Sequence, residues 1–199
     1  MVFLRNRLVS AVHPQTKTGA QYHIGCKKGD VGRYVFLPGD PDRVPKIAGF
    51  WNSAREVSSH REYRVWTGRL DGIRVSACST GIGGPAAAIA VEELAAIGAD
   101  TFIRVGTCGA LRKEIHCGDL IISTAAARLD GTSRQYVQPE YPAVANCEVV
   151  LSLIEAAERL GSLSCRLYCV FRQLLHRSRE TWIWGLPPIG CGKDHRSLE

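Results

Sequence analysis

The apolar and polar positions of residues 73–110 form the most regular pattern in the chain. Residues 73–78 are a short apolar run with the length of a strand, and the turn-forming sequence Ser-Thr-Gly-Ile-Gly-Gly-Pro follows them. Residues 101–106 form a second apolar run, which ends in the sequence Thr-Cys-Gly-Ala. The pattern therefore predicts two strands that each end in a glycine-containing turn.

A helix is predicted between these two strands. Residues 86–97 are rich in Ala and Leu, and Glu92 and Glu93 are their only charged residues. Pro85 lies where the first turn of a helix tolerates proline, and Gly98 lies where helices commonly end. Strand, helix and strand in this order predict parallel strands with a right-handed crossover, and hence an α/β fold. Ligands in such folds gather at the carboxyl ends of the strands.

Further elements are predicted on both sides of this unit. The sequence Asp71-Gly72 favours a tight hairpin turn between residues 64–70 and the strand at 73–78. The other predicted elements are a strand at 33–38, a short helix at 44–50, a strand at 120–125 and a helix at 146–160 that is ended by Gly161. Residues 162–199 show no sustained strand or helix period.

Composition limits the kind of protein and the kind of partner. The chain has 199 residues, of which 45% are hydrophobic and 22% charged, as in one globular domain with its own core. No apolar run approaches the ~20 residues of a membrane span. The net charge of +6 favours anionic partners, but basic residues are not interleaved with aromatic ones as in a nucleic-acid platform. A small anionic substrate is the simpler interpretation.

The eight cysteines indicate a reducing compartment. They lie at positions 26, 78, 108, 117, 147, 165, 169 and 191, and none forms a CxxC pair or a Cys/His cluster with zinc spacing. Several lie in apolar runs, where a free cysteine behaves as a small hydrophobic residue. We therefore expect a cytoplasmic protein without a disulfide framework.

The N-terminal segment differs in charge from the rest of the chain. Residues 1–28 contain no Asp or Glu but several Lys and Arg, a composition that is typical of transit peptides. A plain extension over residues 1–21 is the preferred interpretation.

A candidate phosphate loop follows the first predicted strand. Its sequence is Gly39-Asp40-Pro41-Asp42-Arg43. A glycine at a strand end lets an anion approach the backbone, and an arginine four residues later can form paired hydrogen bonds to a phosphate. A plain Asp-Pro turn with a solvated arginine explains the same sequence, and from this motif alone it is the simpler interpretation.

Taken together, five motifs resemble the nucleoside phosphorylase family, and most closely its bacterial uridine-specific branch. They are Gly39-Asp40-Pro41-Asp42-Arg43, Ser59-His60-Arg61-Glu62-Tyr63, residues 79–85, Glu92-Glu93-Leu94 and residues 104–109, in the family's order and spacing. The resemblance covers about residues 22–161, so the expected organisation is an extension at 1–21, the N-terminal part of the family domain at 22–161 and a non-family tail at 162–199.

The resemblance implies a fold and a reaction. The fold is a three-layer α/β sandwich around a mixed, mostly parallel central sheet. The reaction is phosphorolysis, in which uridine and phosphate give uracil and ribose 1-phosphate. Phosphate is a co-substrate, and no cofactor or metal centre is implied. The family assembles as dimers within a hexamer, so homo-oligomers are the expected assembly.

The resemblance also assigns residues to a site. Gly39, Arg43, Arg104 and Thr107 match phosphate-binding positions, and Arg61 matches one that reaches in from the neighbouring subunit. The three arginines are the expected catalytic residues, because they orient the phosphate against the positive charge that develops on the sugar.

A second group of positions is similar to those that hold the nucleoside. His23 matches the family's contact to the ribose 5′-hydroxyl across the subunit interface, and Tyr22 matches the aromatic residue beside it. Thr107, Cys108 and Gly109 match the lining of the nucleoside pocket. Without the resemblance, a solvated loop histidine would be the simpler interpretation of His23.

Two positions depart from the family's pattern. Glu62, Ile82 and a serine help to hold a monovalent cation between subunits in the family, but Ala86 stands in place of that serine. Cys108 stands where the uridine enzymes commonly carry threonine.

The largest departure is the tail. The family's T-A-S-S-D-x-F-Y-x-G-Q-E-R segment, whose Gln and Arg bind uracil, and its ribose-binding E-M-E segment are absent from residues 162–199. Shifted forward by one nucleotide, the codons of residues 168–180 can encode T-A-S-S-D-S-F-Y-T-G-Q-E-R. We therefore hypothesise a frameshift near Gly161, and a genuinely diverged C-terminus is the competing explanation. A loosely packed tail and little activity are expected as its consequences.

Other functions fit parts of the pattern. A purine nucleoside phosphorylase or a nucleosidase would share the fold, although a hydrolase has less use for Arg43 and Arg104. A catalytically dead module that binds phosphate or assembles with intact subunits is the non-enzyme alternative.

Overall fold

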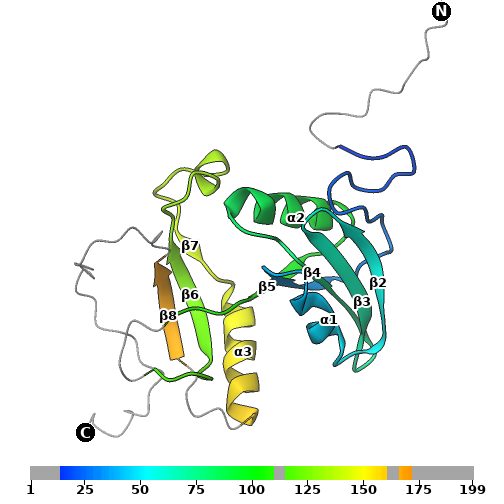
Figure 1. Cartoon of the computed structure of the whole chain (residues 1–199). Coiled ribbons are helices and arrows are strands. Elements are labelled where there is room, and N and C mark those ends of the chain that lie inside the picture. Colours follow the sequence, from blue (N-terminus) through cyan, green and yellow to red (C-terminus); the bar gives the residue numbers. More distant parts are fainter. Residues whose placement is uncertain (1–13, 110–114, 161–165, 172–199) are drawn as a thin grey trace, which may run out of the picture. The chain divides into compact units, whose positions relative to one another are not determined.

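The computed structural model of the chain describes residues 14–109, 115–160 and 166–171 (Figure 1). The chain divides into two compact units, residues 1–107 and residues 108–199, which are described here one at a time. The predicted extension at 1–21 lies outside the described residues except for its last eight.

A five-stranded sheet forms the centre of the first unit. Its strands are β1 (Tyr34–Pro38), β2 (Asn52–His60), β3 (Tyr63–Leu70), β4 (Ile73–Cys78) and β5 (Thr101–Val105), in the order β2-β3-β4-β1-β5. β1 is parallel to both β4 and β5. The predicted parallel direction of residues 73–78 and 101–106 is therefore confirmed, and β1 lies between these two strands.

An antiparallel hairpin joins β3 to β4. Leu70 pairs with Ile73 across the predicted Asp71-Gly72 turn, in which both residues have positive φ angles of 49° and 79°. Such angles favour Asp-Gly in a two-residue turn. β2 adds the outer strand by pairing antiparallel with β3. It was not predicted as a separate strand, because its sequence alternates only loosely.

Two helices cover opposite faces of this sheet (Figure 1). α2 (Gly84–Ala96) packs Ala90 and Leu94 into the cluster that contains Val35 of β1. α1 (Arg43–Ala48) packs Val44 and Ala48 into a second cluster, against which Phe36 of the same strand packs. Because successive residues of a strand point to opposite faces, the two clusters lie on opposite sides of the sheet. This arrangement confirms the three-layer α/β architecture.

The second unit is smaller and contains a three-stranded sheet. β6 (Ile121–Ala127) pairs antiparallel with β7 (Ala143–Val144) and parallel with β8 (Arg166–Phe171). A short 3-10 helix, η1 (Ser133–Gln135), lies between β6 and β7. β8 falls within the range where no strand was predicted. The rest of residues 162–199 lies outside the described residues.

The predicted helix at 146–160 is α3 (Cys147–Arg159). It begins after Asn146, whose side chain accepts a hydrogen bond from the backbone N–H of Val149 at 3.1 Å. An asparagine in this position satisfies one of the backbone donors that the first helical turn leaves without a partner. Ala157 packs against Ile122 of β6 and anchors the helix on its sheet.

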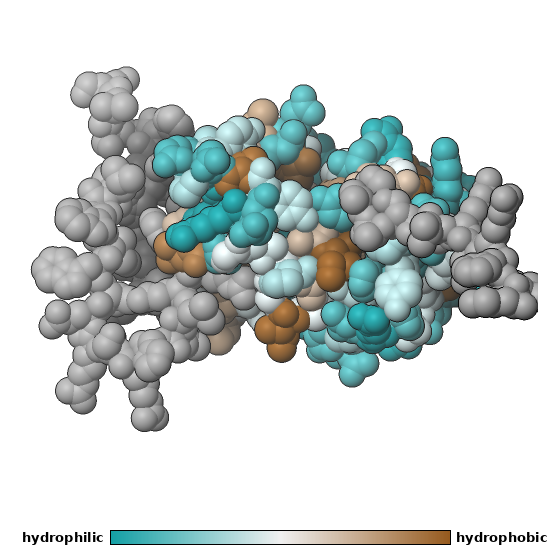
Figure 2. All heavy atoms as spheres, turned by 90° about the horizontal axis from the view of Figure 1, so that it is seen from above, coloured by the Kyte–Doolittle hydropathy of each residue, from teal (hydrophilic) through white to brown (hydrophobic). Residues whose placement is uncertain are grey.

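Large apolar side chains on the surface are dispersed. On the face seen in Figure 2, the hydrophobic areas are separated from one another by hydrophilic ones. Among the described residues, no helix is long and apolar enough to cross a membrane.

Candidate active site

Three loops meet at the carboxyl edge of the first sheet, because β1, β4 and β5 run parallel and end on the same side. Gly39 follows β1, Thr80 follows β4 and Thr107 follows β5. The backbone N–H of Thr80 donates a hydrogen bond to the carbonyl of Pro38 at 3.0 Å. The loops after β1 and β4 are therefore fixed to each other by the backbone.

Arg104 brings a guanidinium to this edge from β5. Its Nη1 donates to the carbonyl oxygen of Leu37 and to Oγ1 of Thr80, both at 2.9 Å. Leu37 is also its register partner on β1. Two hydrogen bonds from one nitrogen restrict the rotation of the guanidinium, so its direction is set by the strand pairing and by a buried hydroxyl.

Gly39 leaves room for this guanidinium. A Cβ atom at this position would lie 3.1 Å from Nη2 of Arg104 and 3.4 Å from the carbonyl oxygen of Gly81. The φ angle of Gly39 is not positive, so the glycine is required here for space and not for backbone conformation. The loop after β1 can therefore approach the arginine more closely than any residue with a side chain would allow.

Arg43 supplies a second guanidinium beside the same strand ends. It is the first residue of α1, and its Nη2 donates to Oγ1 of Thr107 at 3.3 Å. The turn before it is held by Asp40, whose Oδ1 accepts from the backbone N–H of Asp42 at 2.9 Å. Gly39, Arg43, Arg104 and Thr107 are thus gathered at one edge by the two parallel strands, and we call them the edge cluster. Two guanidiniums and a hydroxyl are suited to an anion with several oxygens.

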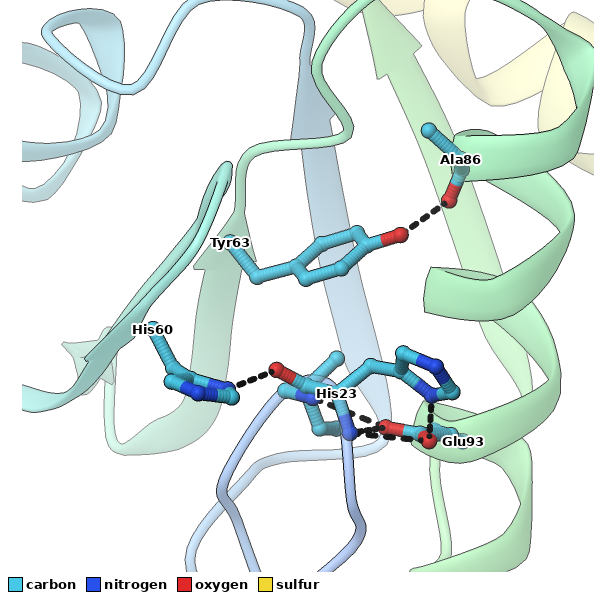
Figure 3. A network of polar contacts seen from close by, with 6 residues as sticks. His23, His60, Tyr63, Ala86 and Glu93 are labelled. Carbon is cyan, nitrogen blue, oxygen red and sulfur yellow. Dashed lines mark hydrogen bonds and ion pairs between the residues drawn. The ribbon is translucent and has the colours of Figure 1, made fainter. Parts of the chain in front are cut away.

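A second cluster is formed by the segment before β1, the end of β2 with the residue after it, and α2, and part of it is drawn in Figure 3. We call it the His23 cluster; its members are Tyr22, His23, His60, Arg61 and Glu93. The ring of Tyr22 lies edge-on to His23 with 5.1 Å between the centroids. Cζ of Arg61 lies 5.6 Å from the centroid of the Tyr22 ring. Tyr22, His23 and Arg61 are therefore neighbours within one chain, and their expected action in an adjacent subunit stays a prediction.

Two members of this cluster, His60 and Glu93, were assigned no role from the sequence, and Glu93 makes most of the contacts. It is 6% exposed, and it accepts hydrogen bonds from the backbone of His23 and Ile24 and from the imidazole of His23. The available signal was its occurrence as one of two charged residues in an otherwise apolar helix pattern. That pattern does not reveal a partner seventy positions away in the chain.

The family's cation positions correspond to Glu62, Ile82 and Ala86 in this chain. A Cβ atom on Gly81 would lie 3.0 Å from Cγ of Glu62, so the Glu62 side chain covers that glycine. Ile82 is 97% exposed. The carbonyl of Ala86 accepts from the Tyr63 hydroxyl at 3.1 Å, as Figure 3 shows. Burial, followed by the charge of Glu62, raises the pKa of Tyr63 to about 12, so this hydroxyl stays protonated as a donor.

Five cysteines are free thiols, namely Cys26, Cys78, Cys108, Cys117 and Cys147. Cys108 is exposed, and with Gly109 it begins the second unit directly after Thr107. Cys26 is fully buried, and burial is the main cause that raises its pKa to about 12. Burial also raises the pKa of Cys78. These two thiols are therefore packing residues and not nucleophiles. Within the part of the chain that the structure covers, no group of three His, Cys, Asp or Glu side chains could hold a metal ion.

Comparison with known proteins places the chain in a family. Residues 33–178 match the phosphorylase superfamily, and the chain belongs to this superfamily. The match continues past residue 161, where the resemblance was expected to end, and it takes in β8.

Similar relatives carry names that describe nucleoside phosphorolysis. A uridine phosphorylase of Thermococcus kodakarensis is 66% identical over 155 residues, which are 78% of this chain and 56% of the relative. The uridine phosphorylase of Escherichia coli is 47% identical over 143 residues, 71% of this chain and 56% of the relative. A guanosine phosphorylase of Halorubrum lacusprofundi is 45% identical over 138 residues, 69% of this chain and 57% of the relative. The chain thus spans little more than half the length of these relatives.

Proposed function

We propose that this chain is the phosphate-binding part of an enzyme that phosphorolyses a pyrimidine nucleoside, with uridine as the substrate. The observation that carries this proposal is the edge cluster, in which Arg104 at the end of β5 lies beside Gly39, and Arg43 at the start of α1 donates to Thr107 after the same strand. The names of the T. kodakarensis and E. coli relatives support uridine as the nucleoside.

The proposed reaction transfers a ribosyl group from a base to phosphate. An oxygen of phosphate forms a bond to C1′ of the ribose, and the bond between C1′ and N1 of uracil breaks. The electron pair of the broken bond leaves with the base, which takes up a proton. Positive charge develops on the sugar during this exchange. Arg43 and Arg104 hold the phosphate dianion next to this charge, and their planar guanidiniums fix its orientation in a way that lysine would not.

The His23 cluster serves the sugar in this proposal. His23 contacts the ribose 5′-hydroxyl, and Arg61 adds a third guanidinium to the phosphate of a neighbouring subunit, so a homo-oligomer is required. Phosphate is a co-substrate, and no other cofactor takes part. A cytoplasmic location is supported by the free thiols of the described cysteines.

Phosphate-dependent release of uracil tests the proposal. Uridine is supplied with and without phosphate to this chain and to a chimera in which the C-terminal part of the T. kodakarensis relative follows residue 161. We expect phosphate-dependent release by the chimera, and loss of most of that release in Arg104→Lys. Release of uracil without phosphate would indicate a nucleosidase. Phosphate binding by both proteins without any turnover would indicate a binding module.

Guanosine is the second candidate substrate. The H. lacusprofundi guanosine phosphorylase shares 45% identity with this chain over 138 residues, so similarity at this level does not by itself select the base. The same assay with guanosine in place of uridine separates the two. Faster phosphorolysis of guanosine by the chimera would not be decisive, because its base-binding residues come from the relative, and so this comparison is made with the unaltered chain.

A further inference from the structure

Glu93 is a buried acid on a helix face that otherwise packs into the core. Ala90 and Leu94 on the same helix are fully buried, and Glu93 is 6% exposed. A carboxylate costs free energy when it is removed from water unless hydrogen bonds replace the water. The contacts of Glu93 therefore indicate what the residue is for.

These contacts are directed to one short segment. Oε2 accepts from the backbone N–H of Ile24 at 2.8 Å, and both carboxylate oxygens accept from the backbone N–H of His23 at 3.0 and 3.1 Å. Oε1 also lies 2.6 Å from Nδ1 of the His23 ring (Figure 3). One carboxylate thus binds both the backbone and the side chain of His23.

His60 fixes the same residue from the opposite side. Its Nδ1 donates to the carbonyl oxygen of His23 at 2.9 Å. The backbone of His23 is therefore bonded at its N–H and at its carbonyl, and its ring is bonded at Nδ1. The side chain remains 23% exposed, so the other edge of the ring is available to a ligand.

The hydrogen-bond network also assigns the proton of the imidazole. An ionised carboxylate has no hydrogen to donate, so the short contact to Oε1 requires a proton on Nδ1 of His23. A neutral imidazole with its proton on Nδ1 carries a lone pair on Nε2. Nε2 then accepts a hydrogen bond and does not donate one.

We propose that Glu93 is a positioning residue that fixes His23 with its proton on Nδ1, so that Nε2 accepts the proton of a sugar hydroxyl. This inference rests on the proposed function, in which His23 contacts the 5′-hydroxyl. It specifies the substrate class as nucleosides with an unmodified 5′-hydroxyl. A 5′-deoxynucleoside has no proton to give, and a 5′-phosphate brings negative charge towards a lone pair and a buried carboxylate.

The tautomer of His23 is measured directly by long-range proton–nitrogen NMR on the full chain, labelled with nitrogen-15. The spectrum is recorded well above about pH 6.5, the ordinary pKa of histidine, and His23→Asn assigns the signals. We expect Nδ1 of His23 to be protonated and Nε2 unprotonated in the wild type. In Glu93→Gln we expect the proton to move to Nε2. Glu92→Gln removes the same charge from an exposed neighbouring position and should leave the signals unchanged.

A protonated Nε2 in the wild type would overturn the proposal, and so would an unchanged tautomer in Glu93→Gln. A role of Glu93 in stability alone would lower the melting temperature without changing the tautomer. The NMR result does not require turnover.

The substrate half of the inference is tested by comparing uridine with 5′-deoxyuridine in the chimera that carries the C-terminal part of the T. kodakarensis relative. Loss of one hydrogen bond should lower the ratio of their kcat/KM values by about tenfold when Glu93→Gln is introduced into the chimera, and Glu92→Gln should keep the ratio of the unsubstituted chimera. An unchanged ratio in Glu93→Gln, with turnover of uridine by the unsubstituted chimera, would overturn this half. Absence of uridine turnover by the chimera would refute the proposed function and the substrate half together, while the positioning half is decided separately by the tautomer of His23.

Discussion

The direction of Arg104 is set by Thr80. Nη1 of the arginine donates to the hydroxyl of this threonine at 2.9 Å, and the threonine is 2% exposed. The same hydroxyl lies 3.4 Å from the carbonyl oxygen of Pro38, to which it can donate in turn. A buried hydroxyl on the loop after β4 thus connects the arginine of β5 to the end of β1.

Removal of this hydroxyl should weaken phosphate binding. In Thr80→Val the shape of the side chain is nearly kept, but Arg104 loses the hydroxyl that accepts from its Nη1 and gains rotational freedom. We expect the affinity for phosphate, measured by isothermal titration calorimetry, to fall by roughly tenfold, because a hydrogen bond to a charged group contributes about 1.5–3 kcal/mol. Thr80→Ser keeps the hydroxyl and should stay close to the wild type. Equal affinities for the Val variant and the wild type would contradict the role given to Thr80.

Addition of a methyl group to Gly39 should affect binding more than stability. Its Cβ atom would lie 3.1 Å from Nη2 of Arg104, and this flexible end can move by a few tenths of an ångström. We expect Gly39→Ala to change the free energy of unfolding by less than about 1 kcal/mol, because the φ angle of Gly39 is not positive and the closest atom belongs to a flexible side chain. Phosphate affinity should fall several-fold because the guanidinium is displaced.

The matched control for this variant is Gly106→Ala. Gly106 follows β5, and a Cβ atom there would meet no other atom within 4 Å. The prediction fails if both variants bind phosphate equally well.

Gly32 should be far less tolerant of the same change. A Cβ atom at Gly32 would lie 2.3 Å from the backbone carbonyl oxygen of Arg74, which cannot move without shifting β4. The N–H of Gly32 also donates to Oγ of the buried Ser76 at 2.9 Å. We expect Gly32→Ala to lower the free energy of unfolding by about 1–3 kcal/mol or more, the usual cost of overpacking. Urea denaturation measures this cost, and a midpoint equal to that of Gly106→Ala would be evidence against the close contact.

Glu56 should make stability depend on pH. Hydrogen bonds from Arg64, and then from Trp66, lower its pKa in the folded protein. A lowered folded pKa gives stability that is present above the unfolded pKa, about 4.3, and is lost as the pH falls through the folded value. The difference in stability between the wild type and Glu56→Gln should therefore shrink on acidification below about pH 4.3.

The measurement is urea denaturation of both proteins at a series of pH values, followed by tryptophan fluorescence. The matched control is Glu92→Gln, which removes an exposed carboxylate from α2. If the difference in free energy of unfolding between the wild type and Glu56→Gln stays constant through the acidic range, the charge of the Glu56 carboxylate contributes nothing to stability.

Much of the first unit could be predicted from sequence because local signals agree there. Between residues 71 and 98, the Asp71-Gly72 turn, the apolar run of β4 and the proline and glycine at the ends of α2 all specify the same elements. β2 gave no comparable signal, because its burial does not alternate regularly and its pairing with β3 shifts register twice. β8 was missed for lack of a clear period in its surroundings.

The residues of the candidate site also fall into two groups, those that the sequence could predict and those that it could not. Gly39, Arg43, Arg104 and Thr107 could be chosen in advance because they lie in motifs, and parallel strands bring the ends of motifs together. Thr80 and Glu93 could not be assigned roles, because each acts on a residue that is distant in sequence. Arg104 lies 24 positions after Thr80, and His23 lies 70 positions before Glu93. Such contacts are created by packing and leave no local pattern.

The central position of β1 has a consequence for the order of folding. β1 precedes its two parallel partners in the chain, and the bond between Leu37 and Arg104 spans 67 positions. The β3–β4 hairpin closes over only two residues and can form within microseconds, whereas distant pairings must first overcome the entropy of closing a long loop. During refolding, tryptophan signals from the hairpin should therefore change before phosphate can bind. On the ribosome, the edge cluster cannot assemble until β5 has emerged, so the first strand to be made waits for the last strand of its sheet.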